Sequence, residues 1–207
     1  MFINIEGVNG VGKSTVISII DSELSKFYET EVIHFPRYDS LLGDTIKNIL
    51  NNNLPHLKQY LQILCSIDRI NFTNEYKNTN KCIIADRYLP SGIVYTSLQD
   101  PNYLQLLQII ERDILVPDYT FILIADDDVI SERILKRNRQ KTMFENINEL
   151  RKQQFLFLDI PYFIPEFNIT YINANDTPQS IADEILSKIR SSLKWYGLFG
   201  FVILYLY

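Results

Sequence analysis

Gly7-Val8-Asn9-Gly10-Val11-Gly12-Lys13-Ser14 follow an apolar run, residues 1–5, and precede an amphipathic segment that starts at Thr15. The glycines let consecutive backbone N–H groups converge on phosphate oxygens, and the next helix offers its positive end to the same anion. The lysine reaches the β and γ phosphates of a nucleotide, and the serine is a ligand for Mg²⁺. The spacing therefore predicts a strand, a phosphate-binding loop and a helix that bind a nucleoside triphosphate. A plain glycine-rich turn is the alternative, and the flanking strand and helix patterns argue against it.

The bulk composition predicts one α/β domain. The chain of 207 residues is 46% hydrophobic, which suffices for one sizeable core. Its net charge of −5 argues against general nucleic-acid binding and favours small partners. Cys65 and Cys82 are the only cysteines and lack metal-ligand spacing, so we expect neither a disulfide framework nor a zinc site, and a cytoplasmic location. The first strand begins at Met1, so we expect no signal peptide.

Apolar β-rich runs alternate with helical patterns, which indicates a parallel sheet with helices on both faces. We expect strands at residues 2–5, 31–35, 82–85, 119–124 and 170–172. We expect helices at residues 13–27, 43–51, 57–78, 91–98, 103–116, 129–137, 146–158 and 178–193. Ligands of such a sheet bind at the carboxyl ends of its strands. The residues after Phe35, Ala85 and Ile124 should therefore join the phosphate-binding loop around one cleft.

Unusual residues do follow these strands, and together they form an ordered set. The set comprises Glu6-Gly7, Phe35-Pro36-Arg37-Tyr38, Arg69 on the long expected helix, Asp86-Arg87-Tyr88 with Ser91 and Tyr95 in register, the basic segment Arg133 to Lys141, Phe144-Glu145 and Asn173-Ala174-Asn175. Over about residues 2–189 the chain resembles the thymidylate kinase family of nucleoside monophosphate kinases. The resemblance implies a P-loop NTPase-type α/β fold with a five-stranded parallel sheet and an arginine-rich lid at about residues 133–145. It also implies a kinase domain at residues 1–194, with ATP and Mg²⁺ as cofactors and dTMP as the phosphoryl acceptor.

The resemblance also implies a role for each matching residue. ATP would contact Gly7, Val8, Asn9, Gly10, Val11, Gly12, Lys13, Ser14, Thr15, Arg133 and Ala174. Lys13, Arg87, Arg137 and Arg139 would be catalytic, and Ser14 and Asp86 would hold Mg²⁺. The acceptor would contact Arg37, Arg69, Arg87, Ser91 and Tyr95, with Arg69 on the thymine and Tyr95 against the deoxyribose. Phosphoryl transfer to a monophosphate needs positioning and charge neutralisation rather than a strong base, because the attacking oxygen is already anionic.

The residues by themselves leave other interpretations open. Arg37 could be a solvated arginine, Tyr95 a core residue, and Asp86 with Arg87 a surface ion pair. The basic segment could be the solvated face of a helix, because Arg133 and Arg137 lie four residues apart.

The chain departs from the family pattern at several positions. Asn9 stands where the family usually has an acidic residue, and Arg37 lies one residue before the family arginine, at whose place Tyr38 stands. Cys65 stands where an aromatic side chain stacks on thymine in other members, and Thr142-Met143 replace the usual Asp-Arg of the lid. Gly10 stands where some members carry an arginine, which indicates that here the lid provides the catalytic cation.

Two other classes of function compete with a monophosphate kinase. A deoxynucleoside kinase shares the Glu-Gly start and the lid, but it phosphorylates a neutral hydroxyl and needs a base. Arg37 and the spacing of Tyr88, Ser91 and Tyr95 favour a monophosphate acceptor, although another nucleoside monophosphate remains possible. A P-loop switch or binding protein is the third candidate. Against a GTPase, residues 80–83 lack the final Asp of an Asn-Lys-x-Asp guanine reader.

The last residues, 195–207, are apolar throughout but short of the ~20 residues of a membrane-spanning helix. We expect them to pack on the domain or on a dimer partner, with a peripheral membrane contact and an extension without function as alternatives. We expect a homodimer without a transmembrane segment.

Overall fold

The computed structural model describes residues 1–136 and 146–203, and the side chains of these except residues 55 and 193–203. Five parallel strands form one sheet in the order β2-β3-β1-β4-β5. They are β1 (Phe2–Glu6), β2 (Thr30–His34), β3 (Cys82–Asp86), β4 (Tyr119–Ile124) and β5 (Ile169–Asn173). The predicted fold class and strands are confirmed, each strand to within one residue at either end.

The central strand β1 carries the phosphate-binding loop at its carboxyl end. All five of its residues are buried, because β3 and β4 flank it and helices cover both faces of the sheet. The chain leaves β1 toward β2 and β3 on one side and reaches β4 and β5 on the other. The loop after β1 therefore lies at the switch point of the sheet, where ligands bind in folds of this kind.

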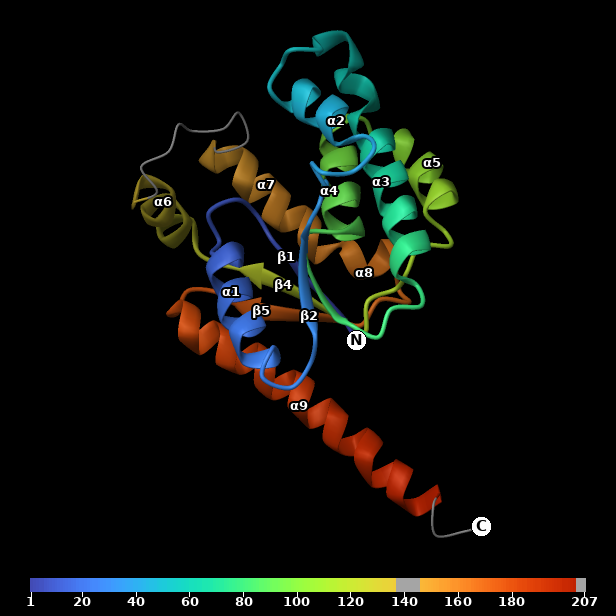
Figure 1. Ribbon diagram of the computed structural model, residues 1–207. Helices are drawn as coiled ribbons and strands as arrows, with labels where there is room; N and C mark the ends of the chain where they lie inside the picture. Colours follow the sequence, from blue (N-terminus) through green and yellow to red (C-terminus); the bar gives the residue numbers. More distant parts are fainter. Residues whose placement is uncertain (137–145, 204–207) are drawn as a thin grey trace.

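Helices lie on both faces of the sheet (Figure 1). On one face α1 (Lys13–Leu24) packs against α9 (Pro178–Ile203). On the other, α4 (Leu89–Gln99) contacts α3 (Leu61–Tyr76), α5 (Tyr103–Ile110), α7 (Ile147–Leu158) and α8 (Ile160–Phe163). Two elements precede α3, namely α2 (Gly43–Leu50) and the 3₁₀ helix η1 (Pro55–Tyr60), and α6 (Asp127–Lys136) follows β4.

Four helical regions differ from expectation. The segment expected as one helix over 57–78 is divided into η1 and α3, and the four-residue α8 was not foreseen because so short a helix has no periodic pattern of its own. The helix expected over 103–116 ends at Ile110, where Glu111 turns inward and is buried. In contrast, α9 continues beyond residue 193 to Ile203, into the apolar segment. Among the described residues no helix is long and apolar enough to cross a membrane.

The hydrophobic core consists of two clusters. The larger cluster fills both faces of the sheet. The smaller one joins α2 and α3 through Ile46, Ile49, Leu61 and Cys65. It holds α2 and η1 as a unit beside the carboxyl end of the sheet, where it forms one wall of the site described next (Figure 1).

Candidate active site

The phosphate-binding loop has glycines where no other residue fits. Gly7 has a φ of +132°, and a Cβ there would lie 2.6 Å from the carbonyl oxygen of Leu123. A Cβ on Gly10 would lie 2.7 Å from Ile134 of α6, so this glycine lets α6 approach the loop and leaves no room for an arginine. Lys13 Nζ donates hydrogen bonds to the carbonyl oxygens of Gly7 at 2.9 Å and Val8 at 3.0 Å.

Glu6 links the phosphate-binding loop to the amino end of α4. Its carboxylate is completely buried. Oε1 accepts hydrogen bonds from the backbone N–H of Tyr88 at 2.6 Å and of Ser91 at 3.3 Å, and Oε2 accepts from Ser91 Oγ at 2.6 Å. A carboxylate at a helix amino terminus accepts hydrogen bonds from the free N–H groups and interacts favourably with the positive end of the helix dipole. The sequence pattern alone predicts no role for Glu6 beyond its place before the loop.

Arg87 lies between the loop and α4. Nη1 donates to the Gly7 carbonyl at 3.2 Å and to Ser91 Oγ at 3.0 Å, and Nη2 donates to Asn9 Oδ1 at 2.5 Å. The guanidinium carbon lies 5.7 Å from the centre of the Tyr95 ring. The backbone of Arg87 has a φ of +72°, a strained conformation for a non-glycine residue. These contacts fix a cation where the loop and α4 meet.

Asp86 ends β3 beside this arginine. Its Oδ2 contacts His34 Nδ1 at 3.2 Å, and its buried Oδ1 has no hydrogen-bond partner among the described residues. Burial by itself raises the pKa of Asp86, but the hydrogen bond with His34 and the charges of Lys13 and Arg87 outweigh it, so the pKa is lowered. An ionised carboxylate with a free oxygen fits a Mg²⁺ ion or one of its waters. Among the described residues no three His, Cys, Asp or Glu side chains cluster as a metal site.

Arg133, a predicted ATP-binding residue in α6, links the phosphate-binding loop to the segment after β5. Arg133 of α6 donates from Nη1 to the carbonyl oxygens of Val11 and Ala174, both at 2.7 Å, and from Nη2 to that of Asp176 at 2.8 Å. The loop, α6 and the segment after β5 therefore form one surface. Arg137 and Arg139, the two lid cations predicted to be catalytic, lie outside the described residues.

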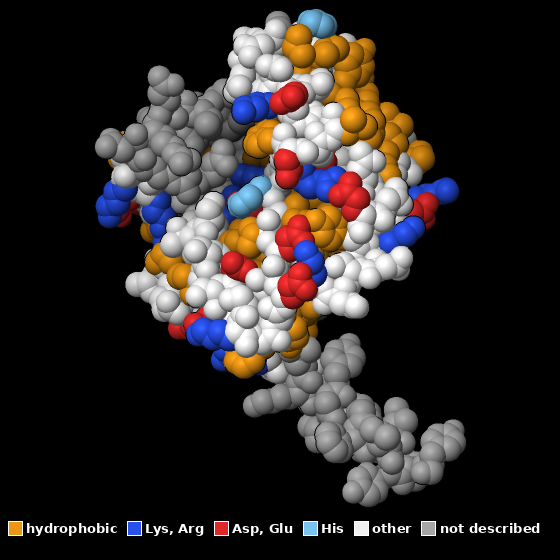
Figure 2. Space-filling view, viewed as in Figure 1, with side chains coloured by type: hydrophobic (Ala, Val, Ile, Leu, Met, Phe, Trp, Pro, Cys, Tyr) orange, Lys and Arg blue, Asp and Glu red, His pale blue; other side chains and the backbone are white. Residues whose placement is uncertain are grey.

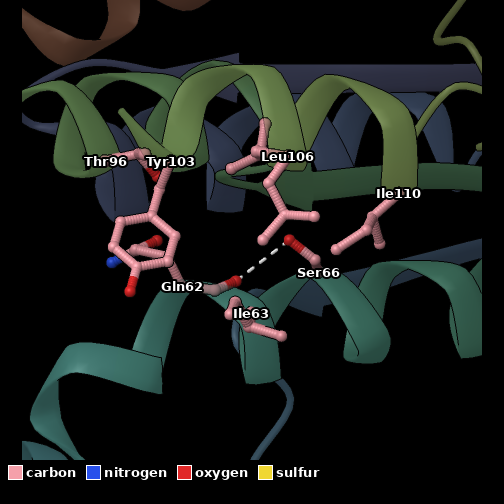
Figure 3. A pocket seen from close by; sticks show the side chains of 8 residues that line it. Gln62, Ile63, Ser66, Thr96, Tyr103, Leu106 and Ile110 are labelled. Carbon is pink, nitrogen blue, oxygen red and sulfur yellow. Dashed lines mark hydrogen bonds between the residues drawn. The ribbon is translucent and has the colours of Figure 1, made fainter. Parts of the chain in front are cut away.

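A cleft of about 960 Å³ opens beside the loop. That volume is within the range of small-molecule sites. Its lining includes five of the predicted site residues, namely Asn9, Arg69, Arg87, Ser91 and Tyr95. A second cavity between α3, α4 and α5 has a volume of only about 20 Å³ and holds one water at most (Figure 3). The larger cleft is therefore the candidate substrate site.

Arg37 forms ion pairs with two carboxylates, those of Asp68 and Glu75. Its Nε donates to Asp68 Oδ1 at 3.0 Å, its backbone N–H donates to Asp68 Oδ2 at 2.7 Å, and Nη1 pairs with Glu75. Among the described residues that line the cleft, Tyr38 is present and Arg37 is not. In this arrangement Arg37 holds the segment after β2 against α3, and its contact with an acceptor phosphate stays a prediction.

Two further residues had no sequence signal, namely Gln153 in the wall of the cleft and Glu111, which pairs with Arg69. Gln153 of α7 is 2% exposed and lines the cleft, and its Oε1 has no hydrogen-bond partner among the described residues. Glu111, directly after α5, binds Arg69 with both carboxylate oxygens. Gln153 lies in an ordinary helical stretch and Glu111 directly follows one, so only the packing of one helix against another reveals them.

Comparison with known proteins agrees with this geometry. The sequence model of the thymidylate kinase family matches residues 5–185. A probable thymidylate kinase of Methanocaldococcus jannaschii is 32% identical over 94% of this chain and 96% of its own length. A thymidylate kinase of African swine fever virus is 29% identical over 91% of this chain and 77% of its own length.

Solved structures share the fold. A thymidylate kinase from Candida albicans superposes with a TM-score of 0.76 at 24% identity, covering 92% of this chain and 91% of its own. A deoxyadenosine kinase from M. mycoides gives a TM-score of 0.70 at 18% identity, covering 92% of this chain and 100% of its own. At these identities the likeness concerns the fold alone. The family model spans most of the chain, from the phosphate-binding loop to α9, and on that ground the chain belongs to the thymidylate kinase family.

Proposed function

We propose that the protein transfers the γ-phosphoryl group of ATP to dTMP, giving ADP and dTDP. The observation that carries the proposal is the position of Arg87, which is bonded to Gly7 and Asn9 of the loop and also lines the cleft. One cation is thus shared by a triphosphate site and a second site beside it. That arrangement suits transfer between two phosphates, and the thymidylate kinase names of the relatives support dTMP as the acceptor.

In the proposed reaction an anionic oxygen of the acceptor phosphate attacks the γ-phosphorus, so no side chain needs to remove a proton. Lys13 exchanges the carbonyl oxygens of Gly7 and Val8 for phosphate oxygens when ATP binds. Arg87 neutralises charge between donor and acceptor. Ser14 and the free oxygen of Asp86 would hold Mg²⁺, which supplies neutralisation of the β and γ phosphates. Arg137 and Arg139 would add charge from the lid.

The acceptor would lie in the cleft with its base against Arg69 and Cys65 of α3 and its sugar beside Tyr95 of α4. Arg69 offers N–H groups to a thymine carbonyl. Gln153 offers an open oxygen, which suits a donor on the base or the sugar and does not suit a phosphate. Arg37 would act by holding the segment that leads to Tyr38.

A coupled ADP-release assay tests the acceptor, with dTMP, dUMP, dCMP, AMP, GMP, thymidine and deoxyadenosine supplied in turn. The highest kcat/KM is expected with dTMP. Measurable turnover of dUMP is also expected, because one methyl group in an apolar pocket contributes roughly 10–200-fold. Activity confined to AMP or GMP, or to nucleosides, would overturn the proposal, and the last result would instead assign a deoxynucleoside kinase.

We also infer a homodimer. Apolar side chains are exposed on neighbouring helices, Ile67 of α3 at 39% and Leu106 and Ile109 of α5 at 39% and 66%. Figure 2 shows hydrophobic side chains gathered on the side of the molecule where Figure 1 places α3 and α5. A second copy of this chain is the proposed occupant. Light scattering should give twice the chain mass for the native protein and the chain mass for Ile109→Glu, and a monomeric native protein would refute the dimer.

A further inference from the structure

Arg69 and Glu111 form a two-point ion pair at the back of the cleft. Arg69 Nε donates to Glu111 Oε2 and Nη2 donates to Oε1, both at 2.6 Å. The two side chains are 4% and 1% exposed, so both charged groups of this pair are buried. Ser66 Oγ donates to the same Oε1 at 2.5 Å, so a neutral donor also fixes the carboxylate. Such parallel hydrogen bonds set the plane of a guanidinium as well as its position.

Glu111 occupies one edge of the Arg69 guanidinium and leaves another edge for a ligand. A guanidinium has five N–H donors, and Glu111 accepts from Nε and Nη2. Within residues 1–136 and 146–192, Nη1 of Arg69 makes no hydrogen bond, while the side chain lines the cleft. The Nη1 edge is therefore the part of Arg69 with donors left for a ligand.

A glycine on α4 gives the guanidinium its place. A Cβ on Gly92 would lie 2.7 Å from Nη2 of Arg69 and 3.2 Å from its Cζ. Gly92 lies inside α4 without a positive φ, so its backbone conformation does not require glycine. Glycine in a helix interior costs about 1 kcal/mol relative to alanine. The space that glycine leaves for the Arg69 side chain offsets this cost.

We propose that Glu111 is a positioning residue that orients Arg69 for the acceptor base and thereby selects 4-oxo over 4-amino pyrimidine monophosphates. This rests on the proposed function. A 4-oxo pyrimidine such as thymine presents an acceptor oxygen to the Nη1 edge. A 4-amino pyrimidine instead presents N–H donors to the N–H donors of Arg69. When such a base enters the cleft, its amino group and Arg69 both lose hydrogen bonds to water without gaining one to each other. Without Glu111 the guanidinium can rotate, and the preference for 4-oxo over 4-amino pyrimidines decreases.

The test compares kcat/KM for dTMP and dCMP in the native enzyme and in Glu111→Gln. The substitution should raise the KM for dTMP on the order of 10-fold, lower the dTMP-to-dCMP preference by a similar factor, and leave the KM for ATP within about twofold. Glu31→Gln is the matched control, because Glu31 accepts a hydrogen bond from Tyr76 of α3 and pairs with Lys81 outside the cleft. The control should keep the native preference.

Breaking a buried ion pair from one side is strongly destabilising, so a second variant keeps the test decisive. The double substitution Arg69→Met with Glu111→Leu replaces the pair by apolar side chains of similar size, which often preserves stability. It should fold and show the same loss of preference.

Two outcomes would overturn the inference. One is an unchanged dTMP-to-dCMP ratio in the folded double variant, and the other is equal loss of kcat for every acceptor in Glu111→Gln with the ratio preserved. Failure of the proposed function is a separate result, namely no turnover of dTMP by the native enzyme. A native enzyme that phosphorylates dTMP and dCMP equally well would refute the inference alone.

Discussion

The donor half of the site, around the phosphate-binding loop, and the acceptor half, between α3 and α4, are built in different ways. In the donor half, Lys13 contacts the carbonyl oxygens of Gly7 and Val8, which lie six and five residues away. In the acceptor half, Arg69 binds Glu111 across 42 residues, and Arg37 binds Asp68 across 31. A motif thus specifies the first half, and the packing of helices specifies the second.

The largest expected effect concerns the donor half. Lys13→Ala should lower kcat on the order of 10²-fold or more at saturating ATP, because catalysis here is mainly electrostatic and the substitution removes a preorganised cation. Steady-state kinetics with dTMP measure this. Lys26→Ala is the control, since Lys26 makes only an exposed pair with Glu23. Near-normal kcat in Lys13→Ala would mean that the loop binds phosphate without contributing its lysine to transfer.

The next effect concerns the junction of the halves. Glu6→Gln should lower the free energy of unfolding by about 2 kcal/mol, since the carboxylate accepts hydrogen bonds from Tyr88 and Ser91 in a buried place. For a chain of this size that is a fall in Tm of roughly 4–8 °C. Thermal unfolding measures it, with exposed Glu23→Gln as the control. An unchanged Tm would show that α4 does not depend on this carboxylate.

In the acceptor half, Arg37→Ala and Asp68→Asn form a pair. Both should raise the KM for dTMP by about tenfold with little change in kcat, because either substitution breaks hydrogen bonds between Arg37 and Asp68 that fix the segment after β2. Equal effects would mean that Arg37 acts through Asp68. A rise in KM confined to Arg37→Ala would instead support a direct contact of Arg37 with the acceptor phosphate.

A smaller effect distinguishes the two cysteines. Burial raises the pKa of Cys65 to about 12 and that of Cys82 to about 11, so at pH 8 their thiolate fractions are on the order of 10⁻⁴ and 10⁻³. Labelling of the native protein by iodoacetamide should be slow at both. Cys65 lines the cleft, so dTMP should slow its labelling further while Cys82 in β3 is unaffected. Peptide mass spectrometry follows both sites, and equal protection by dTMP would argue against a base beside Cys65.

The smallest expected effect lies outside both halves. Deleting residues 195–207 should leave kcat and both KM values within about twofold, because the cleft residues and the described core residues of α9, which lie within 181–189, precede this segment. Association or solubility can change, which size-exclusion chromatography measures. Complete loss of folding would make the segment an integral part of the core.

The sequence predicted the fold almost completely. Continuous apolar runs mark strands that are buried on both faces, and the glycines of the loop fix the end of β1. It also predicted that Arg87, Ser91 and Tyr95 share a cleft with the loop. The partners of the acceptor half could not be predicted in this way. Gln153 is a polar residue of a helix, and Glu111 directly follows a helix. A solvated position is the ordinary expectation for both residues, and only tertiary contacts bury them.

The carboxylate of Glu6 joins the end of the central strand to the first turn of α4, while Arg87 spans the same junction from the side. The platform for the triphosphate and the helix beside the acceptor sugar are consequently parts of one rigid body. In the proposed reaction, the separation of the two phosphates is therefore set by the folded chain before either nucleotide binds. Substrate binding then spends little free energy on bringing the two phosphates together.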